Sequence, residues 1–173
     1  MMAHILSITY RPEKVDIGQD NGARFARVRV AQARLVSGHG IDGDAKAGRH
    51  PCRHLNILSR AWIQAREAEG FAVAPGAFGE QLVIEGLAVE DLAPGERLII
   101  GDAELEITQP RDGCVKVALV HGRALPDCAL PIGMLACVTR SGDIHVGDPV
   151  VRLAREAATH PVADSWTGTD IDL

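Results

Sequence analysis

Short runs in which hydrophobic and polar residues alternate dominate this chain. The clearest is 103–108, where apolar residues alternate with glutamate and threonine. An alternation with period two places one face of a strand in a core and the other in water. An apolar run at 97–100 precedes it, and Gly101-Asp102 between the two runs is typical of a tight turn. The pattern therefore predicts a β-hairpin across 97–109.

Similar short runs recur, and one segment has helical spacing instead. In 60–69 the apolar residues fall on one helical face, Ser59 is a suitable N-cap and Gly70 a suitable stop. Further strands are expected at 5–10, 24–30, 33–37, 55–58, 133–140, 143–146 and 149–153. Many short strands with one or two helices indicate a mainly β fold, of barrel type, rather than a parallel α/β fold.

Two details of this pattern concern the exposure of two arginines and the end of one strand. In 24–30, Arg27 and Arg29 alternate with apolar residues, so both arginines are expected on the exposed face of a strand. Pro110 cannot donate a hydrogen bond to a sheet, so the strand before it is expected to end there. Residues 111–114 would then lie on a loop.

Composition narrows the class of protein. With 173 residues and 46% hydrophobic content, the chain is expected to fold as one domain over 1–157, followed by a polar tail at 158–173. The net charge of −5 and the 3% aromatic content argue against a nucleic-acid partner. No apolar run reaches the roughly 18–20 residues of a membrane span, and no basic signal segment precedes the first strand. A cytoplasmic protein without a membrane partner is expected, with its four cysteines reduced.

The most reactive candidate is Cys114, which lies between Arg111 and Lys116. Nearby positive charge lowers the pKa of a thiol and favours the thiolate, which is both a nucleophile and a metal ligand. A buried, unreactive cysteine explains the same residues about as well. A second basic segment, 41–54, lacks any strand or helix period and is expected to be a long functional loop.

Three other groups of residues have competing interpretations. His50, Cys52 and His54 suggest zinc, but their alternating spacing matches no common structural zinc motif. Asp44 and Glu80 stand next to glycines, where a carboxylate more often binds backbone N–H groups of a turn than acts as acid or base. Cys128 is a candidate resolving thiol for Cys114, although a surface or packed thiol is the simpler interpretation, and Cys137 falls in an apolar run that indicates a structural role.

Taken in order, several motifs make the chain similar to the MOSC domain family, found at the C-terminus of molybdenum cofactor sulfurases and as small stand-alone proteins. The motifs are Gly40-Ile-Asp-Gly-Asp44, Arg53-His-Leu-Asn-Ile-Leu-Ser59, Pro75-Gly-Ala-Phe-Gly-Glu-Gln-Leu82, Leu105-Glu-Ile-Thr-Gln-Pro-Arg111 leading to Cys114, and Gly133-Met-Leu-Ala-Cys-Val138. The resemblance extends from about Ile5 to Leu153. It implies a β-barrel of the pyruvate-kinase-insert type with a few short helices.

The resemblance also implies a function. Cys114 would carry sulfur or ligate molybdenum held by molybdopterin, and the phosphate of this cofactor would be held by basic and polar side chains. The candidates for holding the cofactor are Lys46, Arg49, Arg53, His54, Asn56, Arg111 and Lys116. An enzyme of this type would transfer sulfur or reduce N-hydroxylated small molecules, with an electron-transfer or sulfur-donor protein as partner. The alternative is a non-catalytic barrel that binds a small anion for a regulatory purpose.

Overall fold

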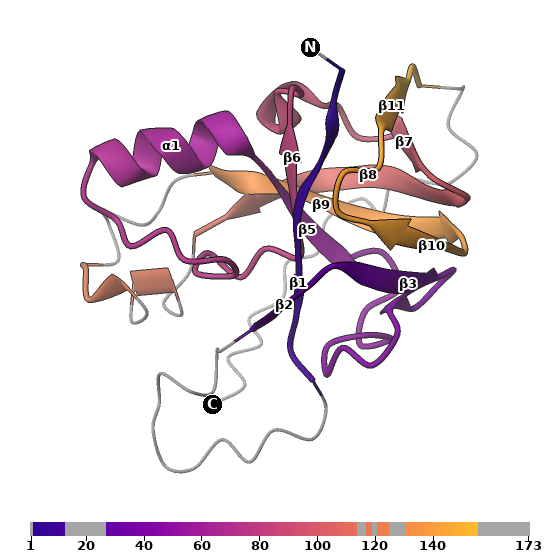
Figure 1. Ribbon diagram of the computed structural model, residues 1–173, viewed down its shortest axis with the longest axis horizontal. Helices are drawn as coiled ribbons and strands as arrows, with labels where there is room; N and C mark the ends of the chain where they lie inside the picture. The colour runs from indigo at the N-terminus through magenta and orange to yellow at the C-terminus, as the bar shows by residue number, and fades with distance from the viewer. Residues whose placement is uncertain (1, 13–26, 114–116, 119–120, 125–130, 156–173) are drawn as a thin grey trace, which may run out of the picture.

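The computed structural model describes residues 2–12, 27–113, 117–118, 121–124 and 131–155 (Figure 1). The strands in these residues are β1 (His4–Tyr10), β2 (Val28–Val30), β3 (Gln32–Val36), β4 (Gly40–Ile41), β5 (Leu55–Ser59), β6 (Leu82–Glu85), β7 (Arg97–Ile100), β8 (Ala103–Asp112), β9 (Pro131–Arg140), β10 (Gly142–His145) and β11 (Val150–Leu153). The helices are α1 (Arg60–Ala68) and the short 3-10 helix η2 (Val89–Asp91). The fold is mainly β, as the sequence predicts.

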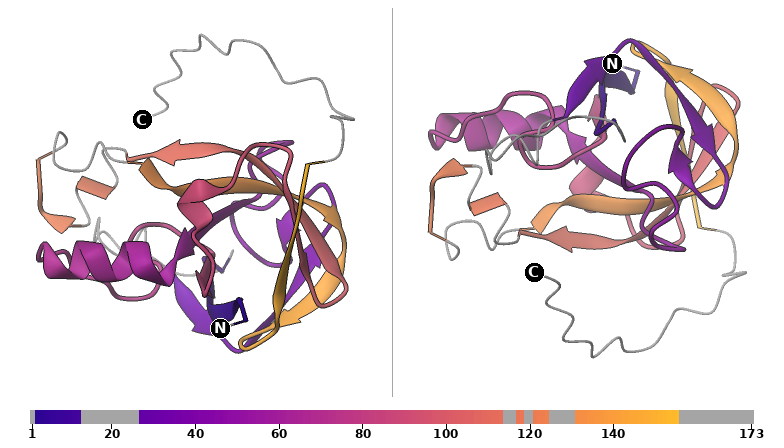
Figure 2. Two further views of the ribbon diagram at one scale, coloured as in Figure 1. Left: turned by 90° about the horizontal axis from the view of Figure 1, so that it is seen from above. Right: turned by 90° about the horizontal axis from the view of Figure 1, so that it is seen from below.

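The strands form one large sheet and one small sheet. The large sheet has the order β11-β7-β8-β9-β5-β6-β1-β2, and the small one has the order β10-β3-β4. All paired strands are antiparallel except β5 and β6, which α1 connects. Figure 2 shows the sheets curled around a common interior, with α1 outside.

The curled sheets give a barrel-like form rather than a single closed ladder. Backbone hydrogen bonds join β1 to the turn between β10 and β11, from Ile5 N to Asp148 O at 3.0 Å and from Gly147 N to Ile5 O at 2.8 Å. Val150 N also donates to Ala3 O at 2.8 Å, so the beginning of β1 lies against the opposite edge of the large sheet. These bonds satisfy backbone groups that an open edge would expose.

Two groups of buried apolar residues stabilise this arrangement. The larger fills the interior of the curled sheets and includes Ile8, Ile57 and Leu105. The smaller packs under α1, where Phe78 lies 4.9 Å from Trp62 between ring centroids. The second cluster fixes α1 and the 75–81 loop, which contains Phe78, to the outside of the barrel-like core.

Several local predictions are confirmed. In the hairpin of β7 and β8, Ile100 pairs with Ala103, and Gly101 in the turn has a φ of 55°. The expected N-cap of α1 is present, because the Ser59 hydroxyl oxygen accepts a hydrogen bond from Trp62 N at 3.0 Å. The loop expected at 41–54 is present between β4 and β5, although Ile41 belongs to β4; its part from Asp44 to His54 is the 44–54 loop.

The prediction that Pro110 ends its strand is wrong. Strand β8 continues to Asp112, pairing Pro110 with Met134 and Asp112 with Pro131 across register shifts. Its other neighbour, β7, pairs only as far as Glu106, so no β7 partner needs a hydrogen bond from residue 110. Arg111 is therefore on a strand rather than on a loop.

The prediction that Arg27 is exposed is also wrong. Its side chain is only 3% exposed, whereas Val28 is 40% exposed. Arg29 is exposed, as predicted, so the two arginines do not share one face. The paired strand is only three residues long and lies at the end of the sheet. Alternation over so short an edge strand does not fix which face is buried.

Two sequence predictions concern the chain ends and the membrane. The tail predicted at 158–173 lies outside the described residues. Within the described part of the chain, no helix is long and apolar enough to cross a membrane.

We expect Gly133→Ala to destabilise the protein by about 3 kcal/mol or more. Gly133 has a φ of +72°, and a Cβ there would overlap the carbonyl oxygen of Ile57 on the neighbouring strand. Gly147→Ala is the matched control, because Gly147 has a φ of +95° with nothing near its Cβ position. Its cost should be only the backbone strain of about 1–2 kcal/mol. Equal losses for both variants in urea unfolding would contradict the close packing of β9 on β5.

Candidate functional site

The 75–81 loop is shaped by its own buried carboxylate. Glu80 is 1% exposed, and its side chain accepts hydrogen bonds from Gly76 N at 2.5 Å and Phe78 N at 3.1 Å. Burial raises the pKa of Glu80, while these backbone N–H groups and the charge of Arg27 pull that pKa down. The expectation that Glu80 binds backbone N–H groups of a turn is confirmed.

The next residue, Gln81, connects this loop to the large sheet and to the basic loop. Its side-chain oxygen accepts from Asn56 N at 2.9 Å, and its backbone N donates to Asn56 O at 2.9 Å. Its side-chain nitrogen donates to Asp44 Oδ2 at 3.2 Å. Gln81 therefore fixes the 75–81 loop, β5 and the start of the 44–54 loop relative to one another.

Asp44 and Arg27 add a buried pair of opposite charges. Arg27 Nη1 lies 3.8 Å from Asp44 Oδ2, and the two side chains are 3% and 2% exposed. Asp44 Oδ1 also accepts from Lys46 N at 3.1 Å, which confirms its expected role in a turn. Burial lowers the pKa of Arg27, and the charges of Asp44 and Glu80 oppose that shift. Among the described residues Arg27 Nη1 has no hydrogen-bond partner.

Arg27 also packs directly on the 75–81 loop. Gly76 has a φ of +83°, and a Cβ at this position would lie 2.7 Å from Arg27 Cβ. Only glycine fits both the backbone conformation and the close approach of the arginine stem.

Arg111 connects the end of β8 to the same loop. Its Nη1 donates to Phe78 O at 2.6 Å. Its Nη2 lies over Gly79, where a Cβ would be 3.2 Å from that nitrogen. The guanidinium is thus held at the point where the chain leaves β8 toward Cys114. Cys114 itself, Lys116 and Cys128 lie outside the described residues.

The buried side chain of Asn56 has no hydrogen-bond partner among the described residues. The residue is 4% exposed, and neither its Oδ1 nor its Nδ2 has a hydrogen-bond partner among the described residues. Asn56 pairs with Leu135 on β9, and Leu135 pairs with Gln109 on β8, so Asn56 and the last part of β8 are two strands apart on one sheet. An unpaired buried amide is costly and is a common mark of a bound water or ligand.

The side chain of His54 is hydrogen-bonded to strand β9. Its Nδ1 accepts from Val138 N at 2.9 Å, so this nitrogen carries no proton and the ring is neutral. Burial lowers the pKa of His54, the carbonyl of Pro51 opposes that shift, and His39 and His50 lower the pKa further.

The remaining predicted cations are on the surface of the 44–54 loop. Lys46, Arg49 and Arg53 are all exposed. The zinc interpretation of this loop gains no support, since no three His, Cys, Asp or Glu side chains among the described residues converge on a metal position. In this loop His50 Nδ1 instead accepts from Cys52 N at 3.1 Å.

A cavity of about 390 Å³ is lined in part by Pro75 and Glu80 of the 75–81 loop. Its described lining includes Ser7, Arg29, Arg60 and Glu80, but none of the residues predicted to hold a cofactor. The hydroxyl of Ser7 is buried there without a hydrogen-bond partner among the described residues.

Comparison with known proteins agrees with this architecture. The family model of the MOSC domain matches residues 44–151, which is more than half of the chain. The chain belongs to the MOSC domain family. This match covers the 44–54 loop, the 75–81 loop and the end of β8, so all three parts of the site lie within the MOSC domain.

Solved structures share the MOSC fold of this chain at low sequence identity. YiiM from Geobacillus stearothermophilus is 23% identical, with a TM-score of 0.67 over 92% of this chain and 80% of that one. The YUAD protein from Bacillus subtilis is 20% identical, with a TM-score of 0.70 over 87% and 94%. YiiM from Escherichia coli is 23% identical, with a TM-score of 0.64 over 90% and 72%. No curated protein matches the chain.

Sequence reasoning missed two residues of this candidate site, Arg27 and Gln81. The apparent alternation in 24–30 places Arg27 on the exposed face, so the sequence pattern gives no sign that Arg27 is buried. Gln81 follows Glu80 and begins an apolar run, and nothing in the local pattern indicates its bonds to β5 and to Asp44. Both residues make their contacts with residues far away in the sequence, and the hydrophobic pattern of one segment does not predict such contacts.

We expect Asn56→Leu to stabilise the purified protein by about 1 kcal/mol, because it removes an unsatisfied buried amide and keeps a similar volume. Gln81→Met is the matched control, since it removes hydrogen bonds that the structure contains and should cost about 2 kcal/mol. Urea unfolding of both variants at one pH measures the two effects. A loss of stability in Asn56→Leu similar to that in Gln81→Met would show that the Asn56 amide is satisfied.

Proposed function

We propose that this MOSC protein works on molybdenum or sulfur chemistry through Cys114. The thiol would act as a sulfur carrier or as a thiolate ligand to molybdenum held by molybdopterin. The observation that carries the proposal is the anchored guanidinium of Arg111, three positions before Cys114, with its Nη1 2.6 Å from Phe78 O. In this proposal Arg111 acts on the Cys114 thiol, because a nearby cation favours the thiolate, which is the reactive and metal-binding form.

The residues present fit a phosphate-bearing cofactor in two respects. The buried Asn56 amide has a donor and an acceptor without partners among the described residues, as expected where a polar ligand completes a site. Gly79 leaves open the space over the Arg111 guanidinium that a Cβ would crowd. Planar N–H donors of this kind suit phosphate oxygens.

The burial of each cation suggests which of them would bind the cofactor phosphate. Arg27 is buried beside Asp44 and Glu80, so its positive charge is largely balanced within the protein. Lys46, Arg49 and Arg53 are exposed, and we assign the cofactor phosphate to these side chains together with Arg111 and Lys116. Asn56 would bind a polar edge of the cofactor, and His54 would support the loop through its bond to Val138.

When bound, the cofactor would supply a metal able to exchange oxygen atoms and electrons with a small substrate. The protein's own contribution would be to hold the phosphate, present the Cys114 sulfur and keep Arg111 beside it. Reduction of N-hydroxylated compounds is the activity that we propose for the metal-ligand role, with an electron-transfer protein as partner. For the carrier role the partner would be a sulfur-donor protein.

Metal analysis and pterin fluorescence on freshly purified protein test this proposal. We expect molybdenum and pterin in the wild type, and loss of molybdenum in Cys114→Ser. Cys128→Ser is the matched control and should retain both. For the carrier role, the wild type should accept persulfide sulfur on Cys114.

One set of results would contradict the proposal. It consists of no molybdenum and no pterin in the wild type, no persulfide on Cys114, and no faster alkylation of Cys114 than of the other thiols. A barrel that binds a small anion without catalysis would then be the better account.

A further inference from the structure

The last part of the 44–54 loop is held against strand β9. His54 N donates to Ala136 O at 3.0 Å, and Val138 N donates to the His54 ring at 2.9 Å. Between these two bonds, the thiol of Cys137 donates to Pro51 O at 3.3 Å. The peptide that joins Pro51 to Cys52 therefore lies directly against the Cys137 sulfur.

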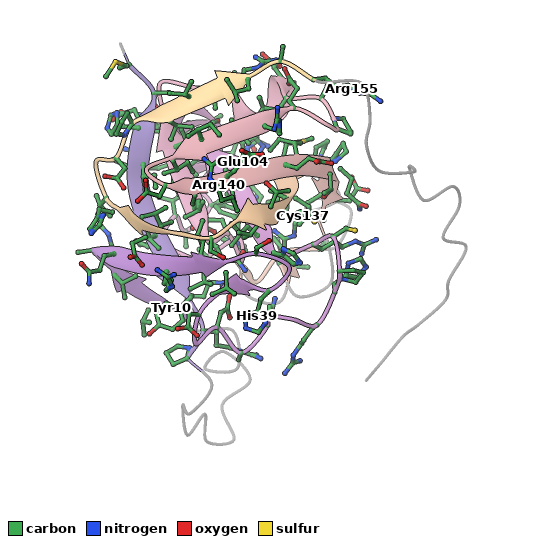
Figure 3. The ribbon with its side chains drawn as sticks, turned by 90° about the vertical axis from the view of Figure 1, so that its right-hand side faces the viewer. Tyr10, His39, Glu104, Cys137, Arg140 and Arg155 are labelled. Atoms are coloured by element: carbon green, nitrogen blue, oxygen red, sulfur yellow. The ribbon has the colours of Figure 1, made fainter. Side chains whose placement is uncertain are left out.

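The two thiols of this region are neighbours. Burial raises the pKa of Cys137 to about 12, the neighbouring Cys52 raises it next, and the charge of Glu106 follows. Cys52 is exposed and Cys137 is half-buried, and both are free thiols. Figure 3 shows Cys137 on an outer face of the sheet, on the same side as Glu104 and Arg140.

A local hydrogen bond helps to fix the Cys52 backbone in this position. Cys52 N donates to His50 Nδ1 at 3.1 Å, which closes a turn around Pro51. A disulfide needs Cα atoms about 4.4–6.8 Å apart. The 3.3 Å contact of Cys137 Sγ with the carbonyl oxygen of Pro51, the residue before Cys52, brings the Cys52 backbone beside the Cys137 sulfur.

We infer that Cys52 and Cys137 form a redox-active dithiol that a low-molecular-weight disulfide converts into a Cys52–Cys137 disulfide. The disulfide exchange at this site requires neither Cys114 nor a bound cofactor.

The exchange proceeds in two balanced steps. The exposed Cys52 thiolate attacks one sulfur of the small disulfide, forms a mixed disulfide and releases one small thiolate. Cys137 then gives up its proton and attacks Cys52 Sγ, which forms the protein disulfide and releases the second small thiolate. Two protein thiols are oxidised, one small disulfide is reduced to two thiols, and the protons lost by the protein are taken up by the released thiolates.

The environment of Cys137 sets this order of attack. Its high pKa makes it the weaker nucleophile while Cys52 is free. In the mixed disulfide, Cys52 no longer carries a charge or a proton, so its contribution to the raised pKa of Cys137 is removed. The second step is thus assisted by the first.

The disulfide would attach the basic loop to β9. The loop contains Lys46, Arg49 and Arg53, all exposed. A covalent bond at Cys52 restricts local opening of the loop, and such opening is what a protease needs to cleave these sites.

The test equilibrates the full chain in mixtures of oxidised and reduced glutathione, alkylates the remaining thiols and identifies the peptides by mass spectrometry. We expect a peptide pair joined through Cys52 and Cys137 in the wild type, and the same pair in Cys114→Ser. Cys137→Ser should instead accumulate glutathione on Cys52. Tryptic cleavage after Lys46, Arg49 and Arg53 should slow about tenfold in the oxidised wild type.

Cys52→Ser is the matched control for folding, because Cys52 is exposed. Its tryptic cleavage should be the same in oxidised and reduced buffer. The inference is overturned if glutathione stays on Cys52 in the wild type to the extent seen in Cys137→Ser. It is also overturned if Cys52 is joined to Cys114 or Cys128 instead.

Discussion

The site depends on one buried carboxylate that organises the loop around it. Glu80 has no exposed surface of consequence, and it binds Gly76 N and Phe78 N of its own loop. Because the loop backbone is held in this way, Phe78 O faces Arg111 and can accept its hydrogen bond. Without the carboxylate, two buried N–H groups would lose their partners at a cost of about 1–3 kcal/mol each. The position of Arg111 would be lost with them.

The same loop explains how the protein buries several charges. Arg27 is balanced by Asp44 and Glu80, and each carboxylate also accepts backbone N–H groups. A buried ion pair is tolerated when its remaining hydrogen-bonding capacity is used. The cations of the 44–54 loop are exposed rather than buried, so they are not part of this balanced group.

The sequence predicts the strands and helices of this fold better than it predicts the contacts between them. The β7–β8 hairpin and the N-cap of α1 follow from local residues and are present. The burial of Arg27 and the continuation of β8 past Pro110 depend on which neighbours a strand has, and the pattern of one strand contains no such information. For the site, the carboxylates were predicted to bind turns, whereas the bridge made by Gln81 was not.

The central claim is that Arg111, held by the 75–81 loop, sets the reactivity of the Cys114 sulfur. The most direct test is the pH dependence of the alkylation rate of Cys114, followed by mass spectrometry in the wild type and in Arg111→Met. A fixed cation favours the thiolate, so the account predicts a higher apparent pKa for Cys114 in Arg111→Met. An identical pH profile in the two proteins would contradict it.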